Sequence, residues 1–258
     1  MRLKEALDAK PGEVISLVGG GGKTTLMFAL AHELAGNGNC VITTTTTKIF
    51  EPSSSETQLL LVEKDDAKMI RLLLENMADY RHITLANEKL VASGKLVGIA
   101  PELVVRLAEL NQVTYVIVEA DGADHRSLKA PNQTEPVIPV NTSLVIPVVG
   151  IDVLGCRLTE EFVFRPEIAS RLLGISIGEV ISAEAIASLI THPQGIIKGN
   201  PEQAGIVPFL NKTDLDDGLK KGREIAREIL RVGHPRIDRI ILGQAQSSEP
   251  VVEVVSRR

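Results

Sequence analysis

Short apolar runs alternate with amphipathic stretches along this chain. A run of strand length that is rich in branched residues predicts a strand, and apolar residues three and four positions apart predict a helix. The predicted strands cover 14–18, 40–47, 59–62, 83–85, 90–97, 114–118, 144–149, 205–210 and 237–242. The predicted helices cover 3–9, 26–36, 65–77, 101–110, 166–173, 183–190 and 218–231. Strands that alternate with helices predict an α/β fold with a mostly parallel sheet flanked by helices.

Segment 150–204 departs from this alternation. Its two predicted helices are separated and followed by turns rich in Gly and Pro. At 258 residues the chain is long enough for one sizeable core. We therefore expect one α/β domain over residues 1–258, with 150–204 as a helical insert or subdomain.

A glycine-rich string stands between the first strand and its helix, which is the context of a phosphate-binding loop (P-loop). Glycines let the main chain turn its N–H groups onto phosphate oxygens, and the helix N-terminus adds further donors. A Lys that follows can reach the β- and γ-phosphates, and a Thr hydroxyl can ligate Mg²⁺. The predicted nucleotide-binding residues here are Gly19, Gly20, Gly21, Gly22, Lys23, Thr24 and Thr25.

This loop is shorter than the usual pattern. The standard string G-x-x-x-x-G-K-[ST] would need its first Gly where this chain has Leu17, inside the predicted strand. The shorter G-x-x-G-K-T string resembles the compact loops of Mur-type ligases and of some GTPases that mature metalloenzymes. It predicts phosphate binding but does not choose between ATP and GTP.

Two carboxylates follow the strand 114–118. Glu119 and Asp121 come directly after buried apolar residues, and Gly122 completes a turn. A carboxylate at the end of a strand beside the P-loop can hold Mg²⁺ directly or through water. We favour Asp121 as the metal-side carboxylate together with Thr24, with Glu119 close behind, although an Asp-Gly pair can also be a plain turn. Lys23, Asp121 and Glu119 are the predicted catalytic residues.

A second motif, Asn211-Lys212-Thr213-Asp214, follows the strand 205–210. N-K-x-D is the guanine-reading motif of GTPases: an Asp carboxylate can accept from guanine N1–H and its amine together, whereas adenine offers no such pair of donors. We predict base contacts from Asn211, Lys212 and Asp214. Pro208 interrupts this strand, which suits an edge or a bulge better than a central position. In the alternative interpretation Asp214 is only a turn or cap residue.

Two further polar segments are open to two interpretations. Hydroxyls of Thr43–Thr47 could meet Mg²⁺ or the γ-phosphate, or the Thr run could reflect strand propensity on an exposed face. Arg126 or Lys129, beyond the acidic turn, could neutralise charge in a transition state, or the loop could simply be solvated.

Composition excludes several classes of function. Net charge is −5, aromatic content is 3%, and there is no Trp, which disfavours nucleic-acid binding. Two distant cysteines disfavour a disulfide framework or a zinc knuckle and suggest a reducing cytoplasm. No apolar run reaches the length needed to cross a membrane. We expect a cytoplasmic protein with neither a nucleic acid nor a membrane as partner.

In its motifs and their order, the chain resembles the YqeC family of P-loop proteins, which are regarded as accessory factors for selenium-dependent molybdenum hydroxylases. The segments that carry the resemblance are 18–25, 42–46, 118–123, 126–131, 135–139 and 211–214. The resemblance implies a role in inserting or maturing the selenium or molybdenum centre of a client hydroxylase. The spacing of residues shows no site for either element.

Three functions compete. The first is a Mg²⁺-dependent nucleoside triphosphatase, with GTP preferred and ATP possible, whose turnover drives a maturation step. The second is an ATP-dependent small-molecule kinase or Mur-like ligase, with its substrate held by 150–204 through Arg157 or Arg165. The third is a switch or chaperone that binds nucleotide and a client protein but barely hydrolyses. Many nucleotide sites need a partner to complete them, so sequence does not separate the first from the third.

Overall fold

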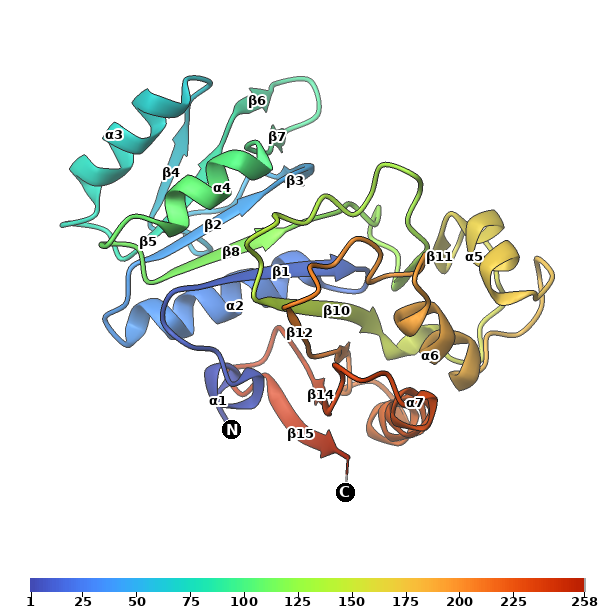
Figure 1. Cartoon of the computed structure of the whole chain (residues 1–258). Coiled ribbons are helices and arrows are strands. Elements are labelled where there is room, and N and C mark those ends of the chain that lie inside the picture. Colours follow the sequence, from blue (N-terminus) through green and yellow to red (C-terminus); the bar gives the residue numbers. More distant parts are fainter. Residues whose placement is uncertain (258) are drawn as a thin grey trace.

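A ten-stranded, mostly parallel sheet forms the centre of the protein (Figure 1) in the computed structural model, which describes residues 1–257. Its order is β15-β14-β13-β10-β1-β8-β2-β5-β4, with β12 also on β10, and only β15 is antiparallel to its neighbour. The strands are β1 (Glu13–Gly19), β2 (Val41–Thr45), β4 (Leu59–Val62), β5 (His82–Ala86), β8 (Tyr115–Glu119), β10 (Leu144–Gly150), β12 (Gly205–Ile206), β13 (Phe209–Asn211), β14 (Arg239–Gly243) and β15 (Val251–Ser256).

Helices cover both faces of this sheet. They are α1 (Leu3–Leu7), α2 (Lys23–Gly36), α3 (Asp66–Asn76), α4 (Pro101–Ala108), α5 (Pro166–Leu173), α6 (Ala183–Thr191) and α7 (Gly218–Val232). Alternate residues of β1 serve two separate cores: Ile15 and Leu17 pack with α1 and α2, while Val14 and Val18 belong to the core that includes α3, α4, α6 and α7. Because successive side chains of a strand point to opposite faces, a strand buried on both sides reads as an unbroken apolar run. The predicted α/β class is confirmed.

Two small sheets lie outside the main one. The first is antiparallel and joins β3 (Lys48–Phe50), β7 (Lys95–Val97) and β6 (Glu88–Leu90) in that order. The second is a parallel pair of β9 (Leu128–Lys129) and β11 (Val163–Phe164). The predicted strand 40–47 therefore ends early, at Thr45, and β3 starts a new direction.

Pro208 breaks the predicted strand 205–210 into β12 and β13, which both pair with β10. β13 also pairs with β14 and is therefore central, so of the two settings expected for Pro208, an edge or a bulge, the edge was wrong. Pro208 fits because it lies between the two strands and its carbonyl oxygen accepts from Ile241 N at 2.9 Å. A break removes the need for the N–H that proline lacks.

The hydroxyls of the Thr-rich segment, Thr43–Thr47, form hydrogen bonds within the protein. Thr43 Oγ1 lies 2.9 Å from His82 Nε2, and Thr45 donates to the main-chain oxygen of Glu119 at 2.7 Å. Residues 43–45 are fully buried, so the interpretation as an exposed face was wrong. Their hydroxyls brace neighbouring strands instead of facing a ligand.

Segment 150–204 contains a single 3₁₀ turn, η1 (Ile151–Val153), then β11, α5 and α6. α6 packs on α7, and both contribute to one of the two cores. Within residues 1–257, none of the helices has the length and apolar character that crossing a bilayer requires.

Candidate nucleotide site

A cavity of about 940 Å³ lies at the carboxyl ends of the central strands. Its lining comes from the start of α2, the loop after β8, the loop after β13, the loop after β14, and the small sheet that contains β3 and β7. In open α/β sheets the carboxyl ends of the strands form the ligand crevice. All three predicted motifs therefore meet at one place.

The glycines of the phosphate loop are required by close packing. Gly21 and Gly22 have φ of +76° and +118°, a region that side chains rarely adopt. A Cβ on Gly21 would collide with the main chain of Gly150, and a Cβ on Gly22 with the side-chain amide of Asn211. Two loops from distant parts of the sequence can touch here only because a side chain is missing.

The first three loop amides are already used within the protein. The N–H groups of Gly19, Gly20 and Gly21 donate at 3.1, 2.9 and 2.8 Å. Their acceptors are Asp121 Oδ2, Val148 O and Arg126 O. The described lining of the cavity begins at Gly21 and continues to Thr25, at the N-terminus of α2. Nucleotide contact by Gly19 and Gly20 stays a prediction, and the geometry favours Gly22–Thr25 as the cradle.

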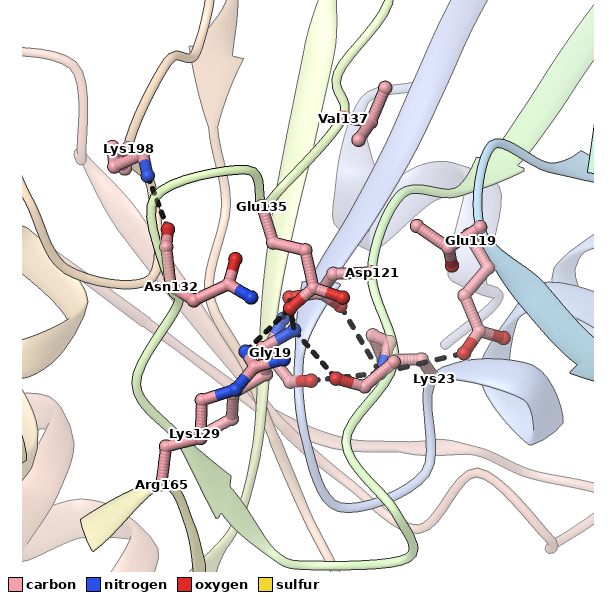
Figure 2. A network of polar contacts seen from close by, with 12 residues as sticks. Gly19, Lys23, Glu119, Asp121, Lys129, Asn132, Glu135, Val137, Arg165 and Lys198 are labelled. Atoms are coloured by element: carbon pink, nitrogen blue, oxygen red, sulfur yellow. Dashed lines mark hydrogen bonds and ion pairs between the residues drawn. The ribbon is translucent and has the colours of Figure 1, made fainter. Parts of the chain in front are cut away.

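Lys23 is held between two carboxylates (Figure 2). Its Nζ lies 3.3 Å from Asp121 Oδ1 and 3.4 Å from Glu119 Oε1, and it donates to Gly19 O at 2.8 Å. All three charged side chains are buried. The residues that sequence predicted to be catalytic thus contact one another directly.

The same line of alternating charges continues away from the cavity. Lys129 Nζ lies 3.0 Å from Asp121 Oδ2 and 2.8 Å from Glu135 Oε2, and Arg165 Nη1 lies 2.6 Å from that same Glu135 oxygen. Lys129 is fully buried and does not line the cavity, so it is not placed to neutralise charge there, as the sequence suggested it could. We call Glu119, Lys23, Asp121, Lys129, Glu135 and Arg165 the buried charge chain.

The ionised neighbours within the buried charge chain shift the pKa values of its residues. Burial opposes the charge of Lys23, but Asp121 and Glu119 outweigh it and raise the pKa of Lys23 above its ordinary value. Burial raises the pKa of Glu119, against the opposing effect of Lys23 and Thr24. Burial also opposes the charge of Glu135, but Lys129 and Arg165 prevail and lower its pKa. Paired charges can stay ionised where a lone buried charge would be neutralised.

Thr24 meets Glu119 and not Asp121. Its hydroxyl donates to Glu119 Oε2 at 2.6 Å, at the cavity end of the buried charge chain. Asp121 faces Lys23, Lys129 and Gly19 N instead. Among these groups, the hydroxyl and carboxylate oxygens that lie together are therefore those of Thr24 and Glu119.

Asn211 joins three loops. Its Nδ2 donates to Gly21 O at 2.7 Å, and its Oδ1 accepts from Ala245 N at 2.8 Å. The side chain is buried, so both contacts are shielded from water. The loop that follows β13 is thereby fixed against the phosphate loop and against the loop after β14.

Lys212 and Asp214 lie beyond this anchor. Lys212, in the left-handed region with φ of 72°, donates to Ser127 Oγ at 2.7 Å and pairs with Asp152 Oδ2 at 2.8 Å. Asp214 is exposed and lines the cavity. The structure therefore brings Asp214 to the cavity and gives Lys212 a partner, Asp152, that sequence reasoning missed. A carboxylate just after the buried strand 144–149 was the available signal.

Comparison with known proteins places this chain in a family. The model of the YqeC protein family matches residues 15–167. The chain is also 34% identical over 200 residues to the "Uncharacterized protein YqeC" of Escherichia coli (strain K12), covering 77% of this chain and 75% of that protein. The chain belongs to the YqeC family. A crystal structure of the hydrogenase maturation factor HypB from Archaeoglobus fulgidus is similar over 96% of this chain and 88% of that one, with 14% identity and a TM-score of 0.42, a likeness too distant to indicate function.

The range matched by the YqeC model includes the phosphate loop and the carboxylates of Glu119, Asp121 and Glu135. It ends before the loop 211–214. The family match therefore spans Gly19–Thr25, Glu119 and Asp121 but not Asn211, Lys212 and Asp214.

One wall of the cavity was predicted from sequence only at Arg126. Lys48, Phe50, Lys95, His125 and Arg126 line it, and we call these five residues the outer wall. Their sequence signal was weak, because they come from two short strands and one loop. The Arg157 and Arg165 side chains, which sequence suggested as substrate contacts, instead bind the protein: Arg157 donates to Gly178 O, and Arg165 pairs with Glu135.

Proposed function

We propose that this YqeC family member binds a nucleoside triphosphate with Mg²⁺, prefers GTP to ATP, and hydrolyses it as an accessory factor that matures a selenium-dependent molybdenum hydroxylase. The observation that carries the guanine preference is the buried side chain of Asn211. It ties the Asp214 loop to both the phosphate loop and the loop after β14. A motif that was only a short string in sequence thereby stands beside the phosphate loop.

The phosphates would lie over the N-terminus of α2. The amides of Gly22–Thr25 and the positive end of the helix dipole suit an anion there. Lys23 would exchange its two carboxylates and the Gly19 carbonyl for phosphate oxygens. After this exchange, its charge would stabilise the negative charge that develops on the phosphates.

The oxygens of Thr24 and Glu119 fit Mg²⁺. A hydroxyl and a carboxylate are hard donors, and their oxygens lie 2.6 Å apart at the phosphate end of the cavity. This favours Glu119 over Asp121 as the metal-side carboxylate, while Asp121 would position Lys23. Bound Mg²⁺ would supply charge neutralisation for the phosphates.

The accessory role rests on the resemblance to the family. It predicts that nucleotide turnover is slow in the isolated protein and rises when the client hydroxylase, lacking its mature centre, is added. Turnover that responds to small metabolites and not to the client would favour the kinase or ligase alternative. Turnover that stays near zero with both would favour a non-hydrolysing switch.

Calorimetric titration of Mg²⁺-GTP and Mg²⁺-ATP tests the guanine preference. Asp214→Ala should remove the preference, and Asp216→Ala, an exposed neighbour on the same turn, should leave it unchanged. Asp214→Asn makes the test sharper, because an amide can donate to the second carbonyl of xanthine where the carboxylate accepted from the guanine amine. That variant should lose affinity for GTP and gain affinity for xanthosine triphosphate.

Equal binding of GTP and ATP, unchanged in both Asp214 variants, would overturn the guanine preference. Loss of binding to all nucleotides in Asp214→Ala would also contradict it, provided that circular dichroism shows the variant to be folded. In that case Asp214 would act on the shape of the loop and not on the base.

A further inference from the structure

The outer wall faces the phosphate loop from the side opposite to the base-reading loop. The strand order places β13 and β14 on one side of β1, and β8 and β2 on the other. The Asp214 loop follows β13, whereas the outer wall comes from β3 after β2, from its partner β7, and from the loop after β8. A nucleotide that spans from the Asp214 loop to Lys23 would therefore leave the outer wall uncovered, at the end of its phosphates.

The strand pleat explains how the outer wall forms. In Lys48-Ile49-Phe50 the buried residue is Ile49, so Lys48 and Phe50 share the opposite face of β3. Lys95 of β7 is paired directly with Phe50, and it therefore points to that same face. Its Nζ lies 4.9 Å from the centre of the Phe50 ring. The alternation of three residues thus presents two ammonium groups and one aromatic ring to the cavity.

A strained turn completes this surface. Asp124 and His125 have φ of 47° and 61°, a conformation that is uncommon for residues with a side chain. Held this way, the His125 ring stacks on Phe50 with centres 5.5 Å apart and an angle of 25° between the planes. Strain of this kind persists where the surrounding structure enforces it, and it gathers at ligand sites.

The cations of the outer wall have no carboxylate within ion-pair distance among residues 1–257. Lys48 is exposed, Lys95 and Arg126 are half-buried, and Arg126 donates only to main-chain oxygens. Asp124 is the one carboxylate of the same turn that lines the cavity, so positive charge prevails. Phe50 is 49% exposed, which is unusual for a large aromatic side chain in a charged cavity.

We propose that the outer wall is a second ligand site, which takes a small molecule with a phosphate or carboxylate group on a planar aromatic body. Lys48, Lys95 and Arg126 would bind the anion, and Phe50 with His125 would contact the ring. The placement of this ligand beside the terminal phosphate rests on the proposed nucleotide function, but the chemistry of the wall does not. The site gives the family a candidate substrate or cargo class that its phosphate motifs do not reveal.

Labelling of lysines by pyridoxal 5′-phosphate tests this site on the full chain. The aldehyde condenses with an amine to an imine and water, and borohydride reduces the imine, so peptide mass spectrometry reports the labelling rate at each lysine. Lys48 and Lys95 should react at least about fivefold faster than exposed Lys220 on α7, and pyridoxal without phosphate should lose most of this difference. Phe50→Ala should slow labelling by about threefold to tenfold, and Lys89→Ala, on the neighbouring strand but off the cavity, should not.

Competitors and nucleotide separate the possible outcomes. Protection by phenyl phosphate but not benzoate would assign the site to phosphates, and the reverse would assign it to carboxylates. Mg²⁺ with a non-hydrolysable GTP analogue should bind in a calorimetric titration and leave Lys48 and Lys95 reactive. Labelling of Lys48 and Lys95 at the rate of Lys220 would overturn the second site. Absence of calorimetric binding of the GTP analogue, with the wall lysines still selective, would overturn the nucleotide function alone.

Discussion

The protein places two groups of cations around one phosphate loop and treats them in opposite ways. In the buried charge chain, Lys23 and Lys129 each lie between two carboxylates, and Arg165 closes the chain on Glu135. In the outer wall, Lys48 and Lys95 face the cavity without such partners among residues 1–257. Removing a paired, buried cation leaves its carboxylates without a counter-charge, whereas unpaired cations in a cavity are available to a ligand.

Lys23 belongs to the first group by its contacts and to the second by its place. It is buried between Asp121 and Glu119, yet it lines the cavity. A nucleotide would have to compete with two carboxylates for it. Asp121 would then keep Lys129 and Gly19 N as its partners.

Lys129→Met should lower the free energy of unfolding by about 3–5 kcal/mol, because it leaves the buried Asp121 carboxylate short of a counter-charge. Urea denaturation followed by circular dichroism measures this loss. Adding Asp121→Asn to Lys129→Met should recover part of it. Lys95→Met, its counterpart in the outer wall, should stay within about 0.5 kcal/mol of wild type.

Equal losses in Lys129→Met and Lys95→Met would contradict the comparison. It would mean that burial and pairing do not distinguish the two groups of cations.

His82 offers the opposite case, a buried base without a carboxylate partner among residues 1–257. Burial and the nearby His32 lower the pKa of His82 from its ordinary 6.5 to about 4. His82 therefore takes up a proton below pH 6.5 in the unfolded chain but only below about pH 4 in the folded protein. Stability consequently falls as the pH falls from 6.5 toward 4. Between pH 7 and pH 5 the loss from this group should be about 2 kcal/mol.

Urea denaturation of wild type and His82→Gln across that pH range isolates the effect. Glutamine keeps a polar group within reach of Thr43 but does not titrate. The difference between the two slopes belongs to His82. Parallel slopes would show that His82 takes up its proton as readily in the folded protein as in the unfolded chain.

Local patterns found most of the sheet and missed its irregular parts. Buried parallel strands such as β10 read as apolar runs, and an amphipathic helix such as α7 shows clear periodicity. β15 was missed because Glu253 interrupts a half-exposed edge. β9 and β11 contain two residues each, too few to show any period.

The same limit holds for the site. The phosphate loop and the Asn211 motif are each an unbroken string of residues, so each could be recognised from its residue types alone. The pairs Lys129–Glu135 and Lys212–Asp152 depend on where loops from different strands meet. Glu119, and not Asp121, lies beside Thr24 because of the direction in which each side chain points at the end of β8. The sequence does not give this direction, since the two carboxylates are only two residues apart.

Glu119→Gln should reduce the Mg²⁺-dependent part of nucleotide affinity by about tenfold or more, because the amide replaces a carboxylate oxygen beside Thr24. Titration of GTP with Mg²⁺ and with EDTA gives that part as a ratio. Asp121→Asn should weaken binding with and without Mg²⁺ alike, since Asp121 contacts Lys23 and Gly19 N. A ratio lost in Asp121→Asn and kept in Glu119→Gln would restore Asp121 as the metal-side carboxylate.

Asp152→Asn should have the smallest effect on stability. The Lys212–Asp152 pair is half-exposed, with 34% and 35% of the two side chains accessible, and such pairs contribute at most about 1 kcal/mol. Thermal unfolding should therefore change little. Affinity for GTP should rise by about twofold to fivefold, because Lys212 must leave Asp152 before its stem can pack on a base. A tenfold fall in affinity would mean that Asp152 holds Lys212 in its binding position, and that the base side of the site is as preorganised as the buried charge chain.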